Sequence, residues 1–132
     1  MEYALKHCGF LLNENSGAKA EPNWDRFANS LQASFLEDTK RKQCVTEFCD
    51  VPPKKQVVGL DHRLEWQDSE PVSDNRSLFL ALRTMRNNLF HGGKSEDPFS
   101  ERSRLLLQAG IEIIHAALDS DPKLARRFEH GY

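Results

Sequence analysis

Apolar side chains recur at helical spacing along most of this chain, with one interruption near its middle. In residues 24–48 they return every three or four positions, directly after Pro22 and Asn23, which are typical of a helix start. The pattern predicts one long helix that runs toward Lys42 and continues as an apolar face. Pro52 follows and ends it.

Four further helices are predicted: one before the helix that starts near residue 24, and three after the interruption. Ser73 or Asp74 has the chemistry of a helix cap, and Gly92-Gly93 that of a helix end. The expected ranges are Glu2–Leu12 for the first helix, Ser73 or Asp74 to about Phe90, Pro98 or Ser100 to Leu118, and Lys123 to about Glu129.

The interruption, Pro52–Asn75, contains prolines and a glycine that resist helix formation. Val57-Val58-Gly59 and Leu64-Glu65-Trp66 could pair as a small hairpin, and the segment is a candidate lid or interface arm. The expected fold is therefore a single domain over residues 1–132, all-α, and a compact bundle of about four to five helices. This long irregular segment separates the second and third main helices. The two best-defined helices are expected to form an antiparallel pair around Gly92–Pro98.

Composition favours a globular protein with only local positive charge. The 132 residues are 39% apolar and 29% charged, with a net charge of −2, so any nucleic-acid contact must use a basic patch rather than the whole surface. No apolar stretch approaches the length of a membrane span, and the first residues do not resemble a signal peptide. Three cysteines without metal-type spacing indicate free thiols in a reducing cytoplasm.

The stretch RTMRNNLFHGGK, at the end of the predicted third helix, carries the candidate chemistry. A helical wheel puts Asn87 opposite the apolar face, with Arg83 and His91 on either side of it. Asn87 and His91 are four residues apart and so lie one turn apart, and Arg86 is long enough to reach them. The Arg–His spacing alone is not specific, since a helix end with solvated basic residues has the same pattern. The adjacent asparagine and the two glycines are what raise its interest.

These residue types suit RNA cleavage by the RNA's own 2′-OH, which leaves a 2′,3′-cyclic phosphate. His91 would move protons near neutral pH, and Arg86 would place fixed charge against the phosphate oxygens. Asn87 would orient the imidazole or the phosphate, and Arg83 and Lys94 would be supporting RNA contacts. No group of acidic, His or Cys residues surrounds the motif to hold a metal, so neither a metal nor another cofactor is expected.

The polar face of the same helix also carries apolar residues. Leu80 lies within it, while Phe79 and Phe90 border it. Such a mixture indicates a contact surface, expected to bind a second copy of the chain.

The string from Arg86 to His91, RNNLFH, resembles the motif of the higher eukaryotes and prokaryotes nucleotide-binding (HEPN) superfamily. The resemblance implies a helical bundle that dimerises, brings two motifs into one cleft and cuts RNA without a metal. It also implies a toxin or antiviral role, with Arg86 and His91 as the catalytic pair and Asn87 in support. Some members carry a Tyr two residues after the His, which a partner antitoxin modifies; this chain has Gly93 there, so that route is not expected.

Two other functions remain open from the sequence. The domain could be a HEPN-like module that binds a nucleotide, RNA or a protein partner without cleavage. It could also be a structural dimerisation bundle.

Overall fold

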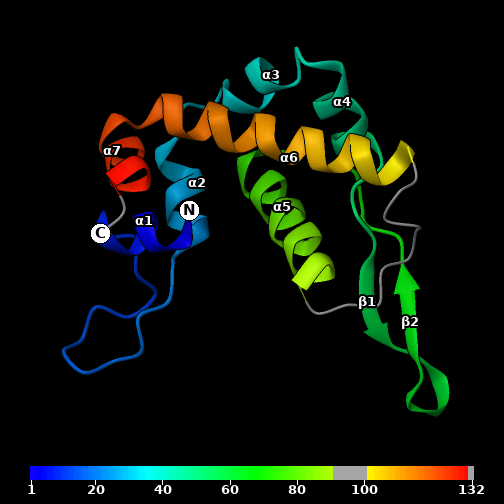
Figure 1. The fold of residues 1–132 in the computed structure, drawn as a ribbon. Coiled ribbons are helices and arrows are strands. Elements are labelled where there is room, and N and C mark those ends of the chain that lie inside the picture. The colour runs from blue at the N-terminus through cyan, green and yellow to red at the C-terminus, as the bar shows by residue number, and fades with distance from the viewer. Residues whose placement is uncertain (91–100, 131–132) are drawn as a thin grey trace.

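The computed structural model describes residues 1–90 and 101–130. Within these ranges the chain forms seven α-helices and one two-stranded antiparallel sheet (Figure 1). The protein is therefore mostly helical, as expected, but it is not a purely α-helical bundle of four to five helices. In chain order the elements are α1 (Glu2–His7), α2 (Trp24–Ser30), α3 (Phe35–Thr39), α4 (Gln43–Asp50), β1 (Lys55–Val58), the 3₁₀ turn η1 (Leu60–His62), β2 (Leu64–Gln67), α5 (Asn75–Phe90), α6 (Glu101–Ser120) and α7 (Pro122–His130).

Helix α6 is the longest element, and the other helices are arranged around it. It packs against α4 and α7, while α1 packs on α7 and α2 packs on α5 (Figure 1). The helices α3 and α4 lie on one side of α6, and α1, the free end of α5 and the hairpin β1–β2 lie on the other. Among the described helices none is long and apolar enough to cross a membrane.

An aromatic cluster centred on Phe79 forms the middle of the core. The centroid of its ring lies 5.4 Å from that of Phe27, 5.9 Å from that of Phe35 and 6.0 Å from that of Trp24. Aromatic rings at these separations stabilise a core beyond the area that they bury. Phe79 on α5 therefore joins α2 and α3, which otherwise are short helices with little intrinsic stability.

Helix α1 ends earlier than the predicted Glu2–Leu12 helix. Gly9 has a φ of +88°, and the amide of Phe10 donates to the carbonyl of Leu5 at 3.0 Å. The amide of Gly9 also donates to the carbonyl of Lys6, so the end is a Schellman motif, in which glycine takes the left-handed conformation. The chain then turns away before the apolar residues Leu11 and Leu12.

The long helix predicted from residue 24 toward Lys42 is wrong, because the chain breaks into α2, α3 and α4. The break after α2 leaves backbone groups without helical partners, and the side chain of Asn75 satisfies two of them. Its Oδ1 accepts from the amide of Leu36 at 3.1 Å, and its Nδ2 donates to the carbonyl of Gln32 at 3.0 Å. Asn75 begins α5, so a distant residue stabilises the break.

Helix α5 begins where the sequence predicts, and it is described as far as Phe90. Asp74 accepts from the amide of Ser77 at 2.7 Å through Oδ1, which is the expected cap. Hydrogen bonds from Ser77 lower the pKa of the Asp74 carboxyl below its usual range. The predicted antiparallel pairing with the next helix is wrong, since α5 runs away from α6 rather than alongside it (Figure 1).

The irregular segment contains the small hairpin that the sequence suggested. Val58 pairs with Leu64 and Gln56 with Trp66 across β1 and β2. At its tip Asp61 and His62 have positive φ values of 58° and 59°, which let the chain reverse. The hairpin projects from the helical body (Figure 1).

Candidate functional site

Arg83, Arg86 and Asn87 lie together near the end of α5, as the helical wheel predicts. Arg86 and Asn87 are exposed, and Arg83 is half-buried. Nη1 of Arg86 donates to Oδ1 of Asn87 at 3.3 Å, so the guanidinium and the amide point to the same place. His91 and Lys94, the other predicted site residues, lie outside the described residues.

Two neighbouring cavities open beside these side chains. The larger, of about 370 Å³, is here called the apolar cavity because most of its lining is apolar. The second, of about 230 Å³, is more polar. The apolar cavity is lined by Met1, Glu2, Tyr3, Trp24, Leu82, Arg83, Met85, Arg86, Leu89 and Ile114. The polar cavity is lined by Glu2, Leu12, Glu21, Pro22, Trp24, Arg83, Arg86 and Asn87.

Four residues are shared by the two cavities: Glu2, Trp24, Arg83 and Arg86. The indole of Trp24 forms an apolar wall, and the two guanidinium groups supply positive charge at the rim. A flat apolar wall beside two fixed positive charges is suited to a ligand with an apolar body and an anionic group.

Glu2 brings negative charge into this site. Its carboxylate lies 3.7 Å from Nη1 of Arg86. Burial lowers the pKa of the Met1 amino group. The charge of Arg86 lowers this pKa further and that of Glu2 raises it, so the three groups interact electrostatically. An exposed ion pair of this kind is worth about 1 kcal/mol or less, and a phosphate can replace the carboxylate at small cost.

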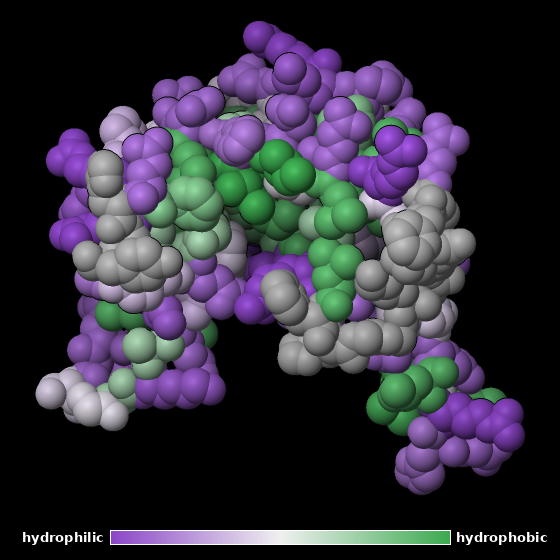
Figure 2. Space-filling model, viewed as in Figure 1, coloured by the Kyte–Doolittle hydropathy of each residue, from purple (hydrophilic) through white to green (hydrophobic). Residues whose placement is uncertain are grey.

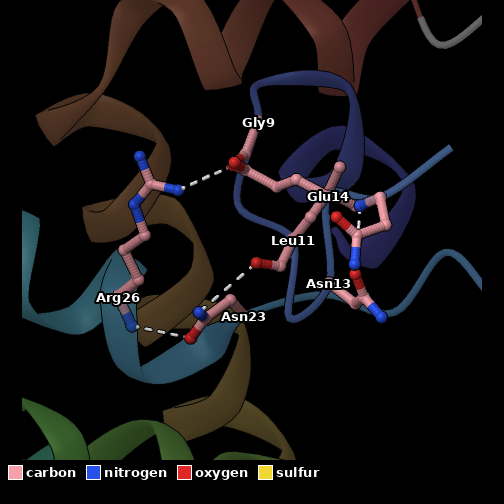
Figure 3. Close-up of polar contacts among 7 residues, drawn as sticks. Gly9, Leu11, Asn13, Glu14, Asn23 and Arg26 are labelled. Carbon is pink, nitrogen blue, oxygen red and sulfur yellow. Dashed lines mark hydrogen bonds and ion pairs between the residues drawn. The ribbon is translucent and has the colours of Figure 1, made fainter. Parts of the chain in front are cut away.

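The contacts that hold α1 near α5 lie in the segment that follows α1 (Figure 3). Nη1 of Arg26 donates to the carbonyl of Gly9 at 3.2 Å and lies 3.1 Å from the carboxylate of Glu14. Asn23 caps α2 by accepting from the amide of Arg26, and its Nδ2 donates to the carbonyl of Leu11. These bonds tie the turn after α1 to the start of α2, which packs on α5.

The two asparagines after Arg86 have different tasks. Asn87 lines the polar cavity, whereas Nδ2 of Asn88 donates to the carbonyl of Lys54 at 3.0 Å and joins α5 to the base of the hairpin. Of these two asparagines, Asn87 is the one that bonds to Arg86.

The predicted contact surface on α5 needs a correction. Phe79 is only 1% exposed because α2 and α3 pack over it, so the prediction that it contacts a second copy is wrong. Leu80 is 48% exposed and faces a separate cavity of about 310 Å³ between α5 and the hairpin. The side chain of Phe90 lies outside the described part of the structure.

All three cysteines are free, as the sequence predicts. Burial raises the pKa of the Cys49 thiol to about 11, and it also raises that of Cys8. Within residues 1–90 and 101–130, no three His, Cys, Asp or Glu side chains gather closely enough to hold a metal ion.

Glu2, Tyr3 and Trp24 belong to the site but do not stand out in the sequence. Trp24 is expected to be a core residue, and it is, yet one face of it also lines both cavities. Glu2 carries no signal, because its partner Arg86 is far away along the chain.

The chain matches no protein-family model, no curated protein and no solved structure. Its function therefore has to be inferred from the chemistry of its own residues.

Proposed function

We propose that this protein is a metal-independent endoribonuclease of the HEPN type that acts as a homodimer. One observation carries the proposal: Arg86 lines two adjoining cavities and bonds to Asn87, which lines the polar one, a few residues before His91 in the sequence. A phosphate at that rim would meet the guanidinium of Arg86 and that of Arg83.

The reaction begins when the 2′-OH of the RNA attacks the adjacent phosphorus. His91 takes the 2′-OH proton, the bond from phosphorus to the 5′-oxygen breaks, and the protonated His91 gives a proton to that leaving oxygen. The products are a 2′,3′-cyclic phosphate and a 5′-OH end. Arg86 stabilises the negative charge that builds on the phosphorane, while Asn87 holds the guanidinium in place through its Oδ1.

The polar cavity, which also borders Arg83 and Arg86, gives the neighbouring nucleotide a place. Leu12 and Pro22 line this cavity beside the arginines and give a base an apolar surface to contact. Lys94 adds positive charge, and the protein works in the cytoplasm as a toxin or antiviral-defence RNase. Regulation by an antitoxin or another defence-system partner fits this role, by a route other than tyrosine modification at position 93.

A cleavage assay in excess EDTA tests this function. We expect the purified wild type to cut single-stranded RNA and to leave cyclic phosphate ends. His91→Ala and Arg86→Ala should each lower the rate at least 100-fold, in line with the usual contribution of a general acid–base group. The matched controls are His115→Ala on α6 and Arg41→Ala between α3 and α4, both exposed residues outside the site.

Equal cutting by all five proteins would point to a contaminating nuclease and would remove the proposal. No cutting by wild type would favour the second candidate, a HEPN-like module that binds a nucleotide, RNA or a protein partner without cleavage. The mainly apolar lining of the larger cavity, with Glu2 already beside Arg86, favours that candidate specifically.

A further inference from the structure

The tip of the hairpin exposes an apolar cluster, here called the arm tip and made of Val58, Leu60 and Leu64. Their exposed fractions are 69%, 85% and 66%. Val58 and Leu64 are directly paired across the two strands, so their side chains share one face of the sheet. Figure 2 shows apolar residues near the end of this projection, with hydrophilic residues at its outermost point.

The hairpin is attached to the body at its base rather than at its tip. Asn88 binds the carbonyl of Lys54, and the hydroxyl of Ser69 donates to the carbonyl of Pro53 at 2.7 Å. A two-stranded sheet is marginally stable in water unless its apolar face packs on something. In the part of the chain that the structure describes the arm tip stays exposed, so a surface that packs on it would stabilise the hairpin.

The apolar cavity is a surface of the matching kind. With a volume of about 370 Å³ it is larger than one leucine side chain, so it can accept Leu60 together with a neighbour. Its rim carries Glu2, Arg83 and Arg86, and the turn of the hairpin carries Asp61 and Arg63. An acidic and a basic residue on the arm thus match basic and acidic residues on the rim.

We propose that the arm tip of one protomer inserts into the apolar cavity of a second copy of this chain. Leu60 fills the cavity, Asp61 faces Arg83 and Arg86, and Arg63 faces Glu2. The hairpin, α1 and the free end of α5 lie on the same side of α6 (Figure 1), so one twofold rotation can bring both arms to both cavities. The exchange closes a symmetric dimer and leaves no unpaired arm.

This arrangement makes each site depend on both chains. Glu2 leaves Arg86 and pairs with Arg63 of the partner subunit. The guanidinium groups of Arg83 and Arg86 then face the partner's Asp61 or a phosphate. The inference names the surface of the proposed homodimer and so rests on that part of the proposed function. It does not depend on RNA cleavage.

Light scattering after size exclusion measures the first consequence. We expect wild type to be a dimer at micromolar concentration, and Leu60→Asp to weaken the dimer at least 100-fold, to a monomer. Phe128→Asp is the matched control, because Phe128 is an exposed apolar residue on α7 that lines neither the apolar nor the polar cavity, and this variant should stay dimeric. Far-UV circular dichroism of each variant checks that it folds.

A photo-crosslinking residue, p-benzoylphenylalanine, in place of Leu60 locates the contact directly. Crosslinked peptides between two chains should contain Tyr3, Met85 or Leu89. Crosslinks to other residues would rule out insertion of the arm tip and leave the homodimer in place. A dimer that survives Leu60→Asp but is lost in Leu80→Asp would do the same. A wild-type monomer would overturn both the arm and the homodimer, and crosslinks to lipid or RNA alone would assign the tip to another occupant.

Discussion

Phe79 and Leu80 are adjacent in the sequence and lie in opposite environments. Phe79 is 1% exposed at the centre of the aromatic cluster, and Leu80 is 48% exposed on the other side of α5. Periodicity places Leu78 and Leu82 in the core correctly. It fails for Phe79 because two short helices, α2 and α3, cover a wider arc of α5 than one neighbouring helix would.

This difference in burial predicts a large loss of stability when Phe79 is truncated and a small change when Leu80 is truncated. Phe79→Ala should lower the free energy of unfolding by about 3–5 kcal/mol, since it leaves a cavity among three other aromatic rings. Leu80→Ala should change it by about 0.5 kcal/mol or less, as expected for an exposed position with a good helix former. Urea unfolding followed by tryptophan fluorescence measures both, because Trp24 stacks on Phe79 at 6.0 Å. Similar losses for the two variants would show that Phe79 does not hold the core together.

Elements that depend on residues close together in the sequence were predicted correctly, whereas the break that depends on a distant residue was not. The start of α5 follows from Asp74 and Ser77, which are three residues apart, and the hairpin follows from two short β-branched and aromatic runs. The break between α2 and α3 depends on Asn75, whose partners Gln32 and Leu36 lie about forty residues away. A helical pattern contains no sign of such a bond, so the pattern predicts one continuous helix.

Helices α5 and α6 approach each other closely at Gly110, and this contact predicts which side chains position 110 can accept. A Cβ at Gly110 would lie 2.6 Å from Cε of Met85 and 3.4 Å from Cδ1 of Leu82. The methyl group of Met85 is the flexible end of a side chain that lines the apolar cavity, so it can move into open space.

Gly110→Ala should therefore leave the free energy of unfolding within about 1 kcal/mol of wild type, because the helix propensity gained offsets the shift of Met85. Gly110→Leu should lower it by about 1–3 kcal/mol through overpacking against Leu82. Thermal and urea denaturation separate these outcomes. A large loss already in Gly110→Ala would mean that Met85 is fixed and that the cavity offers it no room.

For the whole molecule, the candidate site combines residues that sequence reasoning could find with residues that it could not. The motif on α5 is local, so Arg83, Arg86 and Asn87 emerge from one helical wheel. Glu2 joins them only because the turn after α1 is fixed to α2 and α2 packs on α5. The net charge of −2 remains the strongest constraint at this scale, since it confines any RNA contact to the few cations near the cavities.

The salt dependence of RNA binding tests that constraint. Each phosphate neutralised on a single strand contributes about −0.7 to the slope of log K against log salt concentration. Arg83, Arg86 and Lys94 from both protomers therefore predict a slope of about −4 for a 2′-O-methyl RNA, which cannot be cleaved by its own 2′-OH.

Arg83→Gln removes one contact from each protomer and should bring the slope to about −2.8. Arg41→Gln should leave it unchanged, because Arg41, between α3 and α4, lies 3.4 Å from Asp38 and lines neither cavity. A wild-type slope steeper than about −6 would mean that RNA lies across a broad surface rather than at the end of α5. In that case Arg83→Gln would lower the affinity only slightly, and the basic residues of α7 would be the next to replace.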